Sequence, residues 1–113
     1  MKTSERPAKL IPIAVNTRED VLMGLKTYRN FLNHEFQVTR LGLFGSFARG
    51  EQTLKSDIDL LVEFEPNTPG LFEKKRMIKD FLQQIFQREI DLCREKYIKS
   101  YFRDQILKEA LYV

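Results

Sequence analysis

The segment DIDLLVEF, at residues 57–64, limits most strongly how this chain can fold. Side chains alternate between the two faces of a strand, so every second residue here shares a face. The apolar face consists of Ile58, Leu60, Val62 and Phe64. The opposite face begins with Asp57 and Asp59, two like charges that repel by about 4 kcal/mol at about 4 Å and an effective dielectric constant of about 20. A strand with such a start needs something that compensates these charges.

Apolar periodicity predicts the elements around this strand. A first helix begins after Thr17, a candidate N-cap, and runs to about Asn33. The other expected elements are a strand at 38–44, a short helix from Ser46, a helix at 71–86, a strand at 89–93 and a final helix within 101–113, in which Phe102, Ile106 and Ala110 share a face. Short strands alternating with helices predict an α/β (α+β) fold with helices on one face of the sheet, while strand order and direction stay open.

Length and composition favour one small domain. With 113 residues, 42% of them hydrophobic, the chain can bury one modest core. We expect an N-terminal arm at 1–16 and the domain proper at 17–113. The first residues carry charges and two prolines, and no apolar run is long enough to span a membrane. A single cysteine, Cys93, leaves no internal disulfide, so a reducing cytoplasm is the expected location.

The charge pattern argues against direct nucleic-acid binding. The net charge is only +3, and 19 basic and 16 acidic residues are spread along the chain. The one dense basic run, at 74–76, falls within the predicted helix 71–86 and is interpreted as a solvated helix face.

A third aspartate, Asp91, lies in the next predicted strand. If the two strands are neighbours, Asp57, Asp59 and Asp91 converge on one patch. The alternative is that they are solvated residues on the polar face of an antiparallel sheet. Aspartate is depleted within strands, which favours a function, and oxygen ligands of this kind suit Mg²⁺ or Mn²⁺. Because Mg²⁺ usually completes its shell with water and substrate phosphates, the expected substrate class is a nucleotide.

The turn Gly45-Ser46 precedes the same strand and can bind phosphate. A glycine before a helix lets the backbone approach a phosphate closely, and the free N–H groups favour negative charge. Ser46 adds a hydroxyl, and Arg49, one turn later, adds a guanidinium group.

Together these motifs resemble a known superfamily. Gly45-Ser46, ten residues, then Asp57-Ile58-Asp59 is similar to the signature of DNA polymerase β-like nucleotidyltransferases. The strings GSFARGE, SDIDLLVEF and the later EIDL most resemble the minimal nucleotidyltransferase (MNT) antitoxins of HEPN–MNT toxin–antitoxin pairs. The likeness extends over residues 18–113 and implies the nucleotidyltransferase fold, a small mixed sheet with helices on one face.

The resemblance also implies residue roles. Gly45 and Ser46 would hold the β- and γ-phosphates of ATP, with Arg49 as a further phosphate or transition-state contact. The three aspartates, Asp57, Asp59 and Asp91, would ligate two Mg²⁺ ions, and Asp91 would help to deprotonate the acceptor.

In such pairs AMP passes from ATP to a tyrosine of the HEPN ribonuclease toxin, with release of pyrophosphate, and this modification neutralises the toxin. We therefore expect a hetero-oligomer with a cognate HEPN toxin. Two alternatives stay open: neutralisation by binding and occlusion alone, and transfer to a small molecule, as in aminoglycoside-type enzymes.

Overall fold

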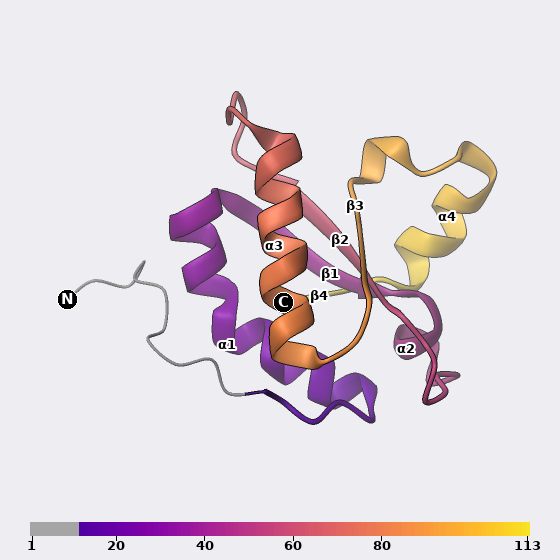
Figure 1. Cartoon of the computed structure of the whole chain (residues 1–113). Coiled ribbons are helices and arrows are strands. Elements are labelled where there is room, and N and C mark those ends of the chain that lie inside the picture. The colour runs from indigo at the N-terminus through magenta and orange to yellow at the C-terminus, as the bar shows by residue number, and fades with distance from the viewer. Residues whose placement is uncertain (1–11) are drawn as a thin grey trace.

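A four-stranded mixed sheet forms the centre of the computed structural model, which describes residues 12–113 (Figure 1). The strands lie in the order β3-β2-β1-β4. β1 is antiparallel to both β2 and β4, whereas β2 and β3 are parallel. The strands are β1 (Val38–Phe44), β2 (Ile58–Phe64), β3 (Ile90–Cys93) and β4 (Leu111–Tyr112). The predicted α/β class and mixed sheet are therefore confirmed.

The helices are α1 (Arg18–Phe36), α2 (Gly45–Arg49), α3 (Leu71–Phe86) and α4 (Ser100–Glu109), with a 3₁₀ turn, η1 (Glu95–Tyr97), before α4. α1 and α3 lie together over the sheet, and α4 lies apart from them, beside α2 (Figure 1). The predicted cap of α1 is confirmed as a capping box, in which Thr17 and Asp20 accept each other's backbone N–H. The helix ends three residues later than expected, where Gln37 adopts a left-handed conformation.

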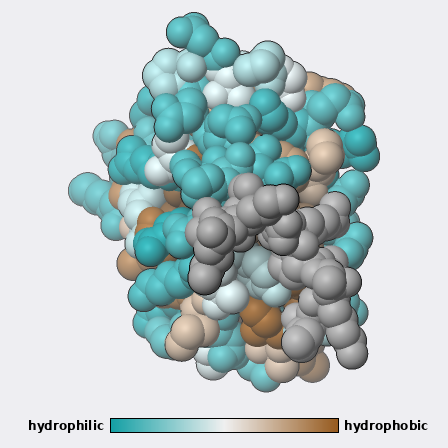
Figure 2. Space-filling view, turned by 90° about the vertical axis from the view of Figure 1, so that its left-hand side faces the viewer, coloured by the Kyte–Doolittle hydropathy of each residue, from teal (hydrophilic) through white to brown (hydrophobic). Residues whose placement is uncertain are grey.

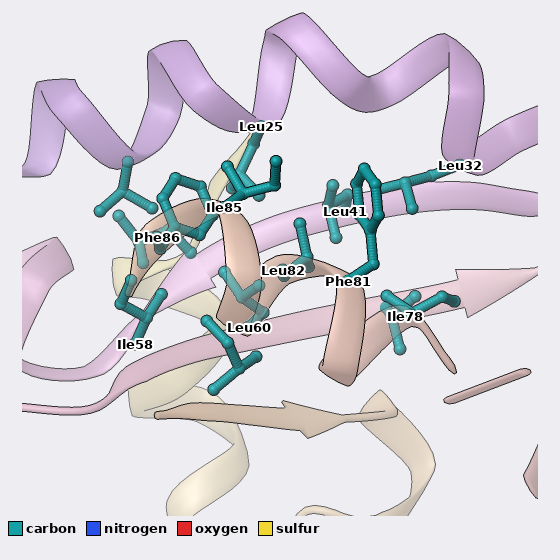
Figure 3. Packing of buried hydrophobic residues seen from close by; sticks show 14 of the residues in the cluster. Leu25, Leu32, Leu41, Ile58, Leu60, Ile78, Phe81, Leu82, Ile85 and Phe86 are labelled. Atoms are coloured by element: carbon teal, nitrogen blue, oxygen red, sulfur yellow. The ribbon is translucent and has the colours of Figure 1, made fainter. Parts of the chain in front are cut away.

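The core lies between α1, α3 and the sheet. α3 contributes Ile78, Phe81, Leu82, Ile85 and Phe86, all at most 1% exposed. Figure 3 shows these side chains packed against residues of α1, such as Leu25, and of the strands, such as Leu41 and Leu60. All four residues of the predicted apolar face of β2 belong to this cluster. The hydrophobic alternation of residues 57–64 thus fixes which face of the sheet the two long helices cover.

The outer surface is mostly hydrophilic on the side of the molecule shown in Figure 2. In the predicted basic run on α3, Arg76 is exposed and pairs with Glu73 and Asp80 of the same helix. These pairs agree with the interpretation of the run as a solvated helix face. Within residues 12–113, no helix is long and apolar enough to cross a membrane.

The last residues correct the prediction of a helix up to the C-terminus. α4 ends at Glu109, and Leu111–Tyr112 pair with β1 opposite Leu43 and Gly42. The Tyr112 ring lies against Gly42, where an added Cβ would approach Cδ1 of the ring to 2.7 Å. The ring is held in place, because the Arg40 guanidinium stacks 4.1 Å from its centroid and its hydroxyl donates to Glu95 at 2.9 Å. Space at Gly42 therefore lets a strand replace the last helical turn.

The N-terminal segment is described from residue 12 onward. The backbone N–H of Ile13 donates to the Ile85 carbonyl, and Val15 is buried in the core cluster. Residues 1–11, most of the predicted arm, lie outside the described residues. The boundary between residues 16 and 17 stays a prediction.

The contact between Gly42 and Tyr112 can be tested in a double-mutant cycle. We expect Gly42→Ala to lower the free energy of unfolding by about 1–3 kcal/mol, because the held ring cannot move away from the new methyl group. In a Tyr112→Ala background the same substitution should cost clearly less. Urea unfolding of the four proteins measures both values, and equal costs in the two backgrounds would disprove the contact.

Candidate active site

Asp59 lies at the centre of the predicted site because of the strand register. It pairs with Phe44 on one side, through the antiparallel ladder of β1 and β2. It pairs with Asp91 on the other side, through the parallel ladder of β2 and β3. The two aspartate-bearing strands are therefore neighbours, which is the condition under which the aspartates were expected to converge. The alternative interpretation was that the aspartates are solvated residues on the polar face of an antiparallel sheet. Instead, β2 and β3 are parallel and Asp59 is half-buried, whereas Asp57 and Asp91 are exposed.

The charges around Asp59 repel one another. Burial raises the pKa of Asp59 to about 6, and the negative charges of Asp91 and Asp57 add to this effect. Asp57 and Asp91 themselves are exposed. The repulsion inferred from the sequence thus acts most strongly on the middle carboxylate, which is half-buried, whereas the other two are exposed.

Gly45 follows β1 and brings the backbone against Asp59. Its φ of +76° is left-handed, and a Cβ at this position would overlap the Asp59 carboxylate and lie 3.0 Å from its Cγ. Only glycine both adopts this φ angle without strain and leaves room for the Asp59 carboxylate. α2 starts at Gly45 itself, one residue before the predicted start, and its second residue, Ser46, is half-buried.

The turn at Gly45 already binds a carboxylate, that of Glu109. The Gly45 N–H donates to Oε1 of Glu109 at 3.1 Å. Arg49 lies at the other end of α2, and its Nη1 donates to both oxygens of Glu109 at 3.2 Å, while its Nε donates to Glu51 at 2.8 Å. The structure therefore brings the predicted phosphate-binding residues Gly45 and Arg49 together. Glu109 was missed, because its position at the end of a helix gives no sign of a partner 60 residues away.

Arg88 is a second residue that sequence reasoning missed. Its guanidinium donates to the carbonyls of Thr53, Leu54 and Ser56, in the loop between α2 and β2, and to the carbonyl of Val15. It also lies 5.0 Å from the centroid of the buried Phe47 ring. Arg88 thereby fixes the loop that delivers Asp57. No sequence motif signals such a role, since carbonyl acceptors are present in every residue.

Clefts lie on both sides of the carboxylates. One, of about 320 Å³, opens between α2 and α4 and is lined by Phe44, Gly45, Arg49, Phe102, Gln105, Ile106 and Glu109. The other, of about 280 Å³, lies beside β3 and is lined by Phe72, Lys75, Arg76, Lys79, Asp91 and Leu92. The first cleft is lined by two of the phosphate-binding candidates, Gly45 and Arg49, and the second by the third aspartate, whereas Ser46 lines neither.

The carboxylates fit a divalent cation by their chemistry. Asp57, Asp59 and Asp91 are hard oxygen donors, and their mutual repulsion around a half-buried Asp59 would be relieved by positive charge. Within residues 12–113, however, no three acidic, histidine or cysteine side chains are arranged so as to hold a metal as they stand. Side-chain rotation, or oxygens supplied by a substrate, would be needed to complete a shell.

The raised pKa of Asp59 predicts a pH-dependent gain in stability when its charge is removed. Between about pH 4 and pH 6 the folded protein binds more protons than the unfolded chain, so wild-type stability falls as the pH rises through this range. In EDTA, Asp59→Asn should be more stable than wild type by about 1–2 kcal/mol at pH 7.5, allowing for solvent screening, and the difference should vanish near pH 4.

Chemical denaturation at several pH values measures this difference. The exposed Asp104→Asn on α4 serves as a control that removes one charge elsewhere. A gain for Asp59→Asn that is constant with pH would show that its charge is not the cause.

Proteins similar in sequence to this chain are named as protein adenylyltransferases. Protein adenylyltransferase MntA of Thermococcus cleftensis is 33% identical over 101 residues, which cover 89% of this chain and all of that protein. A relative from Methanocaldococcus jannaschii is also 33% identical, over 100 residues that cover 88% of this chain and all of the relative.

Solved structures share the fold. A minimal nucleotidyltransferase superimposes with a TM-score of 0.70 at 28% identity, covering 85% of this chain and 95% of that one. The toxin–antitoxin structure MntA-HpeT has a TM-score of 0.57 at 16% sequence identity, and the match covers 88% of this chain and 72% of that one. A toxin–antitoxin structure with AMP-PNP has a TM-score of 0.52 at 17% sequence identity, and the match covers 86% of this chain and 72% of that one. The nucleotidyltransferase domain family itself matches residues 25–113, and the chain belongs to this family as a minimal nucleotidyltransferase.

Proposed function

We propose that this protein is an antitoxin that transfers AMP from ATP to a tyrosine of a HEPN ribonuclease toxin in a Mg²⁺-dependent reaction, in the cytoplasm. The observation that carries the proposal is the register that gathers Gly45, Asp59 and Asp91 at one point. Family membership supports the reaction class. The name of the Thermococcus relative supports a protein acceptor, and the MntA-HpeT structure supports a toxin as the partner.

The nucleotide would bind with its phosphates at the start of α2. The N–H of Gly45 donates to an anionic oxygen in this structure, and Arg49 reaches the same anion. These two groups, with the Ser46 hydroxyl, would bind the β- and γ-phosphates. One of the solved toxin–antitoxin structures contains AMP-PNP, an analogue of ATP, which supports ATP as the nucleotide.

Asp57, Asp59 and Asp91 would hold the Mg²⁺ ions, as their donor chemistry allows. Two bound Mg²⁺ ions would supply stabilisation of the entering and leaving oxygens. Asp59, the most buried of the three, is held in position by the ladders on both sides. Asp57 is positioned by the loop that Arg88 fixes.

In the transfer itself, the acceptor oxygen would form a bond to the α-phosphorus while the bond from that phosphorus to the β-phosphate oxygen breaks. Pyrophosphate would leave with the bonding electrons. The proton of the tyrosine hydroxyl would pass to the Asp91 carboxylate. Asp91 is exposed on β3, an edge strand of the sheet, and lines the cleft beside this strand, from which an acceptor side chain could reach it.

Intact mass spectrometry tests this proposal. The chain is mixed with the product of the neighbouring toxin gene, ATP and Mg²⁺. We expect the toxin to gain one or more AMP units, and Asp57→Asn/Asp59→Asn to abolish the gain because the metal ligands are lost. A toxin that is tightly bound but unmodified would instead favour neutralisation by occlusion, and AMP found only on a small molecule would favour an aminoglycoside-type activity.

Gly45 and Gly50 provide a matched pair of substitutions. Both have left-handed φ angles, +76° and +74°, but only at Gly45 would a Cβ meet the Asp59 carboxylate, since Gly50 has no such neighbour within 4 Å. We expect Gly45→Ala to lower AMP transfer by about 100-fold or more, because the added methyl group would displace the Asp59 carboxylate from its position. Gly50→Ala should introduce only the backbone strain and keep its activity. Similar losses in both variants would show that strain, not the contact with Asp59, is responsible.

A further inference from the structure

Glu109 lies where the proposed function requires a phosphate. Its carboxylate accepts the Gly45 N–H at 3.1 Å and two contacts from Arg49 at 3.2 Å. The side chain of Glu109 is only 14% exposed, although the side chain of Arg49, which pairs with it, is 39% exposed. The two groups that would bind an anionic ligand are therefore both bound to an anion of the protein itself.

The local structure does not favour a glutamate at this position without a partner. Glu109 is the last residue of α4, and negative charge at a helix C-terminus opposes the helix dipole. Its negative charge also adds slightly to the effects that raise the pKa of Asp59, of which burial is the largest. Arg49 and the Gly45 N–H supply the compensating interactions. The position of Glu109 is fixed by the elements on both sides of it in the sequence. It ends α4, and β4, which begins two residues later, pairs with β1.

We propose that Glu109 is an internal competitor of the nucleotide triphosphate, which must displace its carboxylate from Gly45 and Arg49 in order to bind. This inference rests on the proposed function, in which these two residues contact the β- and γ-phosphates. In the nucleotide-free protein, Glu109 keeps the two donors satisfied and Arg49 aimed at the turn. A triphosphate carries more negative charge than one carboxylate and takes over both donors. The carboxylate returns when pyrophosphate leaves.

The competition predicts that weakening the interaction of Glu109 with Gly45 and Arg49 strengthens nucleotide binding. Glu109→Gln keeps an oxygen that can accept the Gly45 N–H but loses the charge that attracts Arg49. We expect ATP and inorganic tripolyphosphate to bind about tenfold more tightly to Glu109→Gln than to wild type, by isothermal titration calorimetry. Glu109→Asp, which keeps the charge but shortens the side chain, should give a smaller gain. AMP has neither a β- nor a γ-phosphate, so its affinity should not change.

Asp104→Asn serves as the matched control, since it removes one negative charge from the exposed part of the same helix. It should leave the affinity for all three ligands unchanged, and a gain equal to that of Glu109→Gln would reduce the effect to net charge and overturn the proposal. Thermal unfolding of each variant establishes that it is folded.

Weaker or unchanged binding of tripolyphosphate to folded Glu109→Gln, with wild type binding normally, would overturn the competition and make Glu109 a purely structural partner of Arg49. Absence of ATP binding in wild type and variant alike would overturn the proposed function, and this inference with it. The failure of one is therefore distinguishable from the failure of the other.

Discussion

The register of three strands around Asp59 is the constraint on which the candidate site depends. One antiparallel and one parallel ladder place this half-buried carboxylate between the end of β1 and Asp91. The left-handed turn at Gly45 then brings the backbone against it. Burial next to like charges works against the folded state, and α1, α3 and the apolar face of β2 supply the burial that offsets this cost. The protein thus holds an unfavourable group of charges in a rigid frame.

The parts of this arrangement that the sequence predicts are those encoded by local periodicity or local chemistry. The alternation in residues 57–64 correctly assigns the buried face of β2, and Thr17 with Asp20 marks the start of α1. The aspartates could be selected because carboxylates are depleted within strands, and Gly45 because a glycine before a helix lets the backbone approach a phosphate closely. Their spacing also carries the resemblance that implied the fold.

The parts that could not be predicted depend on contacts between distant segments. β4 has two residues, too few for a period, and Ala110 continues the apolar spacing of α4 although the chain leaves the helix before it. The pairing of Glu109 with Arg49 joins residues 60 positions apart. Strand direction also stayed open, because the parallel arrangement of β2 and β3 depends on how α3 crosses the sheet and not on the residues of either strand.

The hydrogen bonds of Arg88 have a mechanical consequence. One guanidinium joins the carbonyl of Val15 to the carbonyls of the loop that precedes Asp57. Gln52 of this loop adds a second link, to the carbonyl of Asn16. Hydrogen bonds of Arg88 and Gln52 therefore couple the segment before α1 to the loop before β2. A force applied to the N-terminal segment, for example by an attached protein, is transmitted to the start of β2, although the two are more than thirty positions apart in the sequence.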